Sequence, residues 1–244
     1  WLYTTCLCNE FDSVMHRFPI LLIVALATTT FADSGSSDGQ IFNSRIDSLL
    51  IKAERLYLEE EYERAYFIYA RDLVPLGYKY AQYMVGYMHL VGAGVDRDLE
   101  SALAWYRLAA ELDTPEFVEA YEQLRDQLSD EQLERSEELY RDLLQQYSHV
   151  ALAFEQLKTD ARALSDQQTG TRLTGSSSSL IVVDPASQKL QSGDRYYEER
   201  EARFVRNLAD LEKRLGLNDL SRNPRAIDMA EIEAAVDAYL DRLD

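Results

Sequence analysis

The histidines and cysteines of this chain are not spaced for catalysis or for metal binding. The three histidines are His16, His89 and His149, and no second ligand follows any of them at the third or fourth position, as zinc motifs require. We therefore expect packing or surface roles for histidine. Both cysteines, Cys6 and Cys8, precede the predicted mature chain, which consequently has no disulfide, thiol nucleophile or thiolate metal site.

The acidic residues and the loop glycines also indicate structural roles. Acidic runs at 59–61 and 198–201 offer carboxylates for acid–base chemistry or for Ca²⁺, but neither has the carboxylate and glycine spacing of a calcium loop. Residues 92–94, Gly-Ala-Gly, lack the preceding strand, the third glycine and the lysine of a nucleotide-binding loop. We predict no catalytic residue, no cofactor and no metal, and we expect a protein that is not an enzyme.

Composition limits the classes of partner. The chain of 244 residues is 46% hydrophobic, which is enough for a buried core, and its formal net charge is −18. Phosphate binding requires a patch of Lys and Arg, and no such patch occurs in this acidic sequence. Nucleic acid and anionic lipid are therefore excluded as expected partners.

The N-terminal region has the order of a secretory signal peptide. A basic start at 15–17 precedes an apolar run at 18–27 that is too short for a bilayer span, and small residues follow before a polar stretch that begins at Asp33. A buried apolar helix is the competing interpretation, which the abrupt polar stretch disfavours. We predict an exported, periplasmic or secreted protein with no stable membrane span after cleavage. The expected segments are a non-native upstream extension at 1–14, a signal peptide at 15–32 and a flexible lead at 33–44.

Apolar residues recur at helical spacing from residue 45 onward and predict an all-α fold. Helices are expected on both sides of the acidic turn at 59–61, and Pro75 and Gly77 end the second helix before a third over 78–91. Copies of a helical hairpin are also visible, and their length is typical of solenoid repeats. A constant offset superposes Ala65 on Ala102, Tyr69 on Tyr106 and Glu63 on Glu100.

Residues 81–113 resemble the Sel-one-like (Sel1-like) repeat, a relative of the tetratricopeptide repeat. The resemblance rests on Ala81, Gly86, Gly92, Gly94, Asp98, Ala102, Trp105, Tyr106, Ala109 and Ala110. Gly86 and the two helical alanines permit close helix approach, the loop glycines permit positive φ, and Asp98 is suited to cap a helix. The resemblance implies a short right-handed solenoid of antiparallel helix hairpins that binds a protein or peptide on its concave face.

Some positions depart from the repeat pattern. His89 and Ser101 stand where the family usually has Tyr and Lys, and Leu108 and Asp113 replace its usual Lys and Gly. The cysteine-bridged secreted branch of the family is excluded, because no cysteine follows residue 8. We therefore expect an exported bacterial type without disulfides.

Downstream, helix-start signals predict helices that cap the repeat. Thr114 with Pro115 begins one, and Ser129 with Gln132 begins a long one that continues past Val150. The apolar segment 180–183 is either an isolated edge strand or a segment that docks elsewhere or is unstructured, and the second alternative is favoured because no partner strand is evident. The expected segments are a repeat domain with capping helices at 45–164, a linker at 165–194 and a C-terminal helical segment at 195–244. The C-terminal helices have three alternatives, which are to pair together, to return to the repeat or to bind a partner.

Tyrosines crowd the predicted repeat, and most of them are expected to pack in its core. Tyr83 and Tyr87, one turn apart, are the candidates for a partner-binding groove, with His89 and Arg107 as further candidates. The predicted function is an exported scaffold or adaptor for protein–protein interaction, with a role in envelope signalling or assembly. The alternatives are a structural subunit of an envelope complex, assembled through its C-terminal helices, and a cell-wall-active enzyme that uses paired carboxylates.

Overall fold

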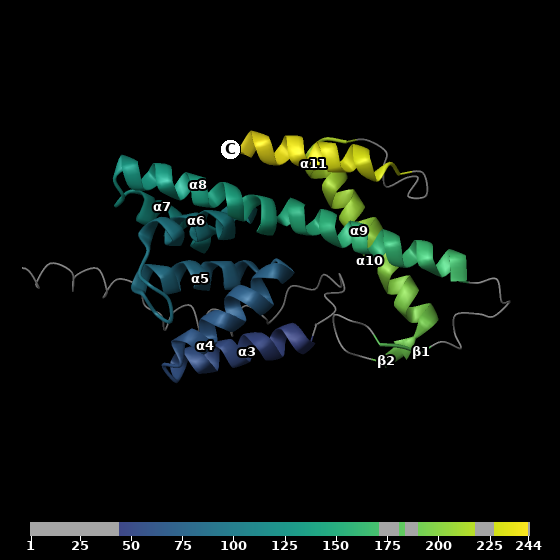
Figure 1. Cartoon of the computed structure of the whole chain (residues 1–244), viewed down its shortest axis with the longest axis horizontal. Helices are drawn as coiled ribbons and strands as arrows, with labels where there is room; N and C mark the ends of the chain where they lie inside the picture. The colour runs from purple at the N-terminus through teal and green to yellow at the C-terminus, as the bar shows by residue number, and fades with distance from the viewer. Residues whose placement is uncertain (1–43, 171–180, 184–189, 218–226, 244) are drawn as a thin grey trace, which may run out of the picture. The chain divides into compact units, whose positions relative to one another are not determined.

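The computed structural model describes residues 44–170, 181–183, 190–217 and 227–243 (Figure 1). Their regular secondary structure is helical apart from one small hairpin of strands, which confirms the predicted all-α fold. None of the described helices is both long and apolar enough to span a bilayer. The predicted upstream extension, signal peptide and flexible lead lie outside the described residues, except for Ser44.

Helical hairpins follow one another along the first part of the chain. Helix α3 (Ser44–Leu58) pairs with α4 (Tyr62–Phe67), α5 (Lys79–Val91) pairs with α6 (Leu99–Ala109), and α7 (Pro115–Arg125) precedes α8 (Asp130–Tyr147). A π-helical turn (Ile68–Leu73) and a 3₁₀ turn (Val74–Leu76) extend α4, and a 3₁₀ turn (Ala110–Leu112) extends α6. This order confirms the predicted succession of helix, turn and helix.

Capping residues explain where these helices begin and end. The Asp98 side chain accepts the backbone N–H of Ser101 at 3.0 Å, which starts α6. Ser129 and Gln132 form the predicted reciprocal capping box, which starts α8. Gly92 ends α5 in the left-handed region, with φ of 75°.

Two glycines allow successive helices to approach each other. A Cβ atom at Gly86 would lie 2.7 Å from the Tyr106 ring and 3.1 Å from the Ala102 carbonyl oxygen. Only glycine therefore permits this contact between α5 and α6. A Cβ atom at Gly94 would lie 2.4 Å from the carbonyl carbon of Tyr62, so the loop after α5 packs against the start of α4.

The C-terminal part consists of three helices and the strand hairpin. Helix α9 (His149–Gly170) packs against α10 (Gly193–Leu215), and α11 (Met229–Leu243) packs on both. Strands β1 (Ile181–Val183) and β2 (Leu190–Ser192) pair antiparallel, with Val183 opposite Leu190. The predicted linker at 165–194 is therefore wrong in three places. Its first residues belong to α9, which reaches Gly170, its last residues belong to α10, which begins at Gly193, and β1 and β2 lie between them.

The long helix predicted from Ser129 is also divided. Helix α8 ends at Tyr147, and Ser148 has an extended ψ of 156° before α9 begins. The Ser148 side chain is buried, and its hydroxyl oxygen accepts the backbone N–H of Ala151 at 3.1 Å. Ser148 therefore caps a new helix, which allows α9 to take a direction of its own.

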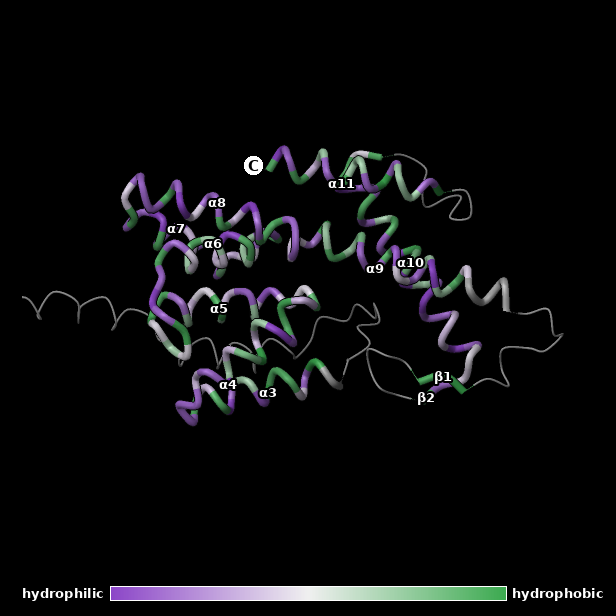
Figure 2. The backbone as a smooth tube through the Cα atoms, viewed as in Figure 1, coloured by the Kyte–Doolittle hydropathy of each residue, from purple (hydrophilic) through white to green (hydrophobic). Residues whose placement is uncertain are grey.

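The apolar faces of the helices meet in two clusters of buried residues, and the hydropathy along each helix alternates accordingly (Figure 2). The first cluster contains residues from each of the helices α3, α4, α5, α6 and α7, and it includes Leu56, Tyr69 and Tyr106. The second joins α6 to α8, α9, α10 and α11 and includes Leu108 and Leu157. Of the three alternatives for the C-terminal helices, both pairing together and returning to the repeat are thus observed.

Candidate interaction surface

Helix α6 separates the two clusters, so the C-terminal helices cover one side of the repeat. Ala102 and Tyr106 are buried in the first cluster, whereas Ala104 and Leu108 are buried in the second. Trp105 contacts both clusters, and its ring stacks on Tyr147 with 5.9 Å between centroids. This side of α6 is therefore closed to a partner by the chain itself.

Arg107 lies on the covered side and has partners within the chain. Its guanidinium carbon lies 3.8 Å from the centroid of the Tyr140 ring, and its Nη1 forms an ion pair with Glu137. Its Nη2 also lies 3.5 Å from the carbonyl oxygen of Leu243, near the end of α11. Arg107 was predicted to line a partner-binding groove. Its contacts instead lie within the chain, where the side chain holds α8 and α11 against α6.

A buried polar junction connects the repeat to α9 and α10. The Lys79 ammonium donates to the Leu108 carbonyl at 3.0 Å and pairs with the Glu111 carboxylate at 2.7 Å. The same carboxylate accepts the backbone N–H of His149 at 2.8 Å, at the start of α9. The His149 ring in turn lies 2.7 Å from Asp210 of α10. Burial lowers the pKa of Lys79, and the charge of Glu111 opposes that shift.

Tyr83 does not lie in a groove, contrary to the prediction. Its exposed fraction is 7%, and its ring stacks between Tyr106 and Phe117 at centroid distances of 5.1 and 5.3 Å. The ring therefore connects α5 to α6 and α7 in the first cluster. Tyrosine suits either a core or an interface. The partner that buries the Tyr83 ring, Phe117, lies in the next hairpin, so the sequence around Tyr83 does not reveal it.

His89 is half-buried between α5 and α4. Its Nε2 lies 3.2 Å from the Tyr66 hydroxyl, and the two rings meet edge to face. Burial lowers the pKa of His89, and the nearby Asp98 carboxylate opposes that shift. The residue is engaged in packing, which agrees with the general expectation for histidine and corrects its candidacy for the groove.

Half-buried tyrosine rings lie together on α3 and α5, and we call Tyr57, Tyr78, Tyr80 and Tyr87 the tyrosine face. Tyr57 and Tyr87 meet edge to face with 6.2 Å between centroids, so the Tyr87 ring lies beside α3. The role of Tyr87 in partner binding stays a prediction. Burial raises the pKa of Tyr57 and of Tyr80, so both phenols stay protonated and can act as hydrogen-bond donors.

Glu54 lies on α3, three residues before Tyr57 and therefore on the same side of that helix. It is half-buried, and burial raises its pKa. Burial chiefly raises the pKa of Tyr78 and of Tyr80, and the charge of Glu54 adds to both shifts, as the charge of Asp47 does for Tyr78. Within the described residues it forms no ion pair or hydrogen bond. A partly buried carboxylate without a partner has lost some of its hydration, and a cation from another molecule would relieve that cost.

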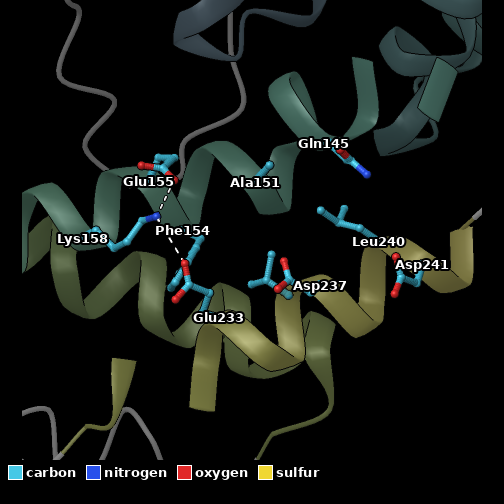
Figure 3. A pocket seen from close by; sticks show the side chains of 10 residues that line it. Gln145, Ala151, Phe154, Glu155, Lys158, Glu233, Asp237, Leu240 and Asp241 are labelled. Atoms are coloured by element: carbon cyan, nitrogen blue, oxygen red, sulfur yellow. Dashed lines mark ion pairs between the residues drawn. The ribbon is translucent and has the colours of Figure 1, made fainter. Parts of the chain in front are cut away.

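A groove lies between α9 and α11, with a volume of about 500 Å³ (Figure 3). Apolar side chains of Phe154, Val236 and Leu240 line it, and the carboxylates of Asp237 and Asp241 border it. No group of three or more His, Cys, Asp or Glu side chains in the described part of the chain is arranged to hold a metal ion. The groove is thus bordered by carboxylates, and its apolar lining residues are almost fully buried.

Residues 79–113 match the Sel1 repeat family. This segment is a Sel1 repeat. It covers α5, α6 and the 3₁₀ turn that follows, and it contains every position on which the resemblance rested. Neither the curated proteins nor the solved structures gave a match to the chain. Sel1 repeats are generally modules for protein–protein interaction and are not usually enzymatic.

The departures from the Sel1 repeat pattern have structural explanations. Asp113 ends the repeat with φ of 56°, a conformation that Asp tolerates better than most residues where Gly is usual. The Ser101 hydroxyl donates to the Asp98 carboxylate at 2.6 Å and so strengthens the cap of α6. Leu108 replaces a usual lysine and is fully buried under the C-terminal helices. Of these departures, Leu108 lies where the C-terminal helices of the chain cover its own repeat.

Proposed function

We propose that this protein is an exported scaffold or adaptor that binds a protein or peptide through the tyrosine face of its helical repeats. The observation that carries the proposal is the unequal cover of the two sides of the Sel1 repeat. The chain's own helices bury Leu108 and engage Arg107, whereas the tyrosine face retains half-exposed rings around Glu54. Tyrosine is enriched at protein interfaces, because it combines a large apolar ring with a polar hydroxyl.

Export is supported by the sequence of residues 15–32, which has the basic start, apolar run and small residues of a signal peptide. The proposed partner is therefore a protein or peptide outside the cytoplasm. A role in envelope signalling or assembly is in keeping with this compartment.

A second candidate function is that of a structural subunit in an envelope complex, and the strand hairpin favours it. Ile181 is 77% exposed, Val183 is 52% exposed and Leu190 is 72% exposed, and the register places them on one face of β1 and β2. The apolar residues along one side of α10 and of α11, by contrast, are buried within the chain. Assembly would therefore use the hairpin and not the helices that the sequence indicated.

Site-specific photo-crosslinking in the native envelope tests the first proposal. A photoreactive residue replaces Tyr87 in the full chain, and the control replaces Glu138, which is exposed on α8. We expect a discrete crosslinked partner from the Tyr87 position that the Glu138 position does not give. Equal products from both positions, or none from Tyr87, would contradict binding at the tyrosine face.

A further inference from the structure

The groove between α9 and α11 is a second surface with the features of a binding site. Its acidic border on α11 consists of Glu233, Asp237 and Asp241, which recur every fourth residue and so lie on one side of the helix. Successive carboxylates are therefore about 6 Å apart along the axis. The opposite wall comes from α9 and the end of α8, with Phe154 in the floor (Figure 3).

One end of the groove already holds a cation of this chain. The Lys158 ammonium lies 4.6 Å from the centroid of the Phe154 ring and 2.5 Å from the Glu155 carboxylate. It also reaches Glu233, across the groove, at 3.9 Å (Figure 3). This arrangement places a positive charge over an aromatic face and between carboxylates, which is a favourable environment for it.

The other end of the groove has the carboxylates without the cation. Asp237 and Asp241 are exposed, and within the described residues neither has an ion pair or hydrogen bond. Leu240 and Val236 line the groove beside them, with only 8% and 4% of their surface exposed. A ligand that supplies positive charge would complement the two carboxylates, and the aliphatic parts of Lys and Arg side chains can pack on the small apolar area that stays exposed.

We propose that the groove binds a basic segment of a partner protein, whose Lys or Arg side chains pair with Asp237 and Asp241 and whose aliphatic parts cover Leu240. A second copy of this chain is a poor occupant, because each copy has a formal net charge of −18. Phosphate-bearing lipids and nucleic acids would be repelled by the same carboxylates. The proposal is independent of the tyrosine face, which lies on α3 and α5.

The test measures binding of a fluorescent alanine-based peptide with arginine at every fourth position, by anisotropy, to the full chain. A matched peptide has glutamine in place of arginine. Ionic strength is kept low, because the screening length is only about 10 Å at 0.1 M salt. We expect the arginine peptide to bind and the double variant Asp237→Asn/Asp241→Asn to bind it about tenfold more weakly, or about 1.4 kcal/mol.

Matched variants separate the groove from the general charge of the protein. Glu134→Gln/Glu138→Gln removes two exposed carboxylates with the same spacing on α8, and we expect less than a twofold change. Lys158→Met frees the carboxylates that the lysine occupies and should strengthen binding about threefold, whereas Lys213→Met on α10 should not. Equal losses for both double variants, or equal binding of the glutamine peptide, would overturn the proposal. Neither result would affect the crosslink at Tyr87.

Discussion

Helix α6 offers a comparison between two sides of the same repeat. Toward α5 it presents small residues and Tyr106, and the close approach at Gly86 holds the hairpin together. Toward α8 to α11 it presents Leu108, where the Sel1 repeat usually has lysine. The first side packs within the repeat, and the second packs on helices that lie outside the repeat.

The two sides also differ in how charge is used. In the first cluster the contacts are apolar, both aliphatic and aromatic, and include the stacking of Tyr83 on Phe117. The C-terminal helices are held in addition by a buried ion network, in which Asp160 is fully buried and accepts from Arg200 at 2.7 Å and from Arg203 at 2.6 Å. The side that packs on the C-terminal helices thus contains buried charge, whereas the tyrosine face, the proposed partner-binding surface, contains partly exposed rings.

The largest expected effect comes from restoring the usual lysine at position 108. Leu108→Lys removes a fully buried side chain, a loss comparable to the 2–5 kcal/mol of a buried Leu→Ala, and adds the desolvation of an ammonium group. We expect α8 to α11 to separate from a repeat that stays folded. Hydrogen exchange would show rapid exchange in α9 to α11 with protection retained in α5. Equal loss of protection in both regions would mean that the two clusters fold as one unit.

Next in size is the loss of the buried carboxylate. Asp160→Ala leaves Arg200, whose side chain is 9% exposed, without its ion pair, and removing one partner of such a pair costs about 3–5 kcal/mol. Urea unfolding followed by circular dichroism measures the change. The double variant Asp160→Leu/Arg200→Met replaces both charges by apolar groups and should recover most of the stability. Failure to recover would indicate that packing, and not the stranded charge, causes the loss.

These two regions were not equally predictable from sequence. The caps at Asp98 and Ser129 and the close approach at Gly86 depend on residues that are near in sequence or on a repeat pattern, and the structure confirms them. The network at Asp160 was missed, because its arginines lie on another helix and no local spacing connects them.

The other differences have the same origin. The partner of β1 is the short segment Leu190–Ser192, which has too little apolar character to be recognised as a strand before the pairing is known. Tyr83 was placed in a groove because its spacing with Tyr87 is right for one, but its neighbour Phe117 lies in the next hairpin. Residues that pack within one hairpin were predicted, and residues that pack between distant elements were not.

The smallest expected effect concerns Glu54, and it separates stability from binding. Because the pKa of Glu54 in the folded chain is raised above its ordinary value of 4.5, the folded state binds the proton more tightly than the unfolded state does. That contribution to stability is fully present below pH 4.5 and is lost as the pH rises through the folded value. Glu54→Gln should therefore raise the free energy of unfolding at pH 7 by up to about 0.5 kcal/mol, and the gain over the wild type should vanish at low pH.

The same substitution should weaken binding of the partner that is crosslinked at Tyr87, because it removes the uncompensated charge of Glu54 beside the tyrosine face. A residue that only supports the fold would not lose binding while it gained stability. Urea unfolding at pH 7 and at pH 4 gives the first quantity, and the crosslinking yield gives the second. Glu63→Gln, on the exposed side of α4, is the matched control and should change neither. If Glu54→Gln destabilises the protein at pH 7, the carboxylate has a favourable contact within the chain, and the tyrosine face loses the feature that distinguishes it from ordinary packing.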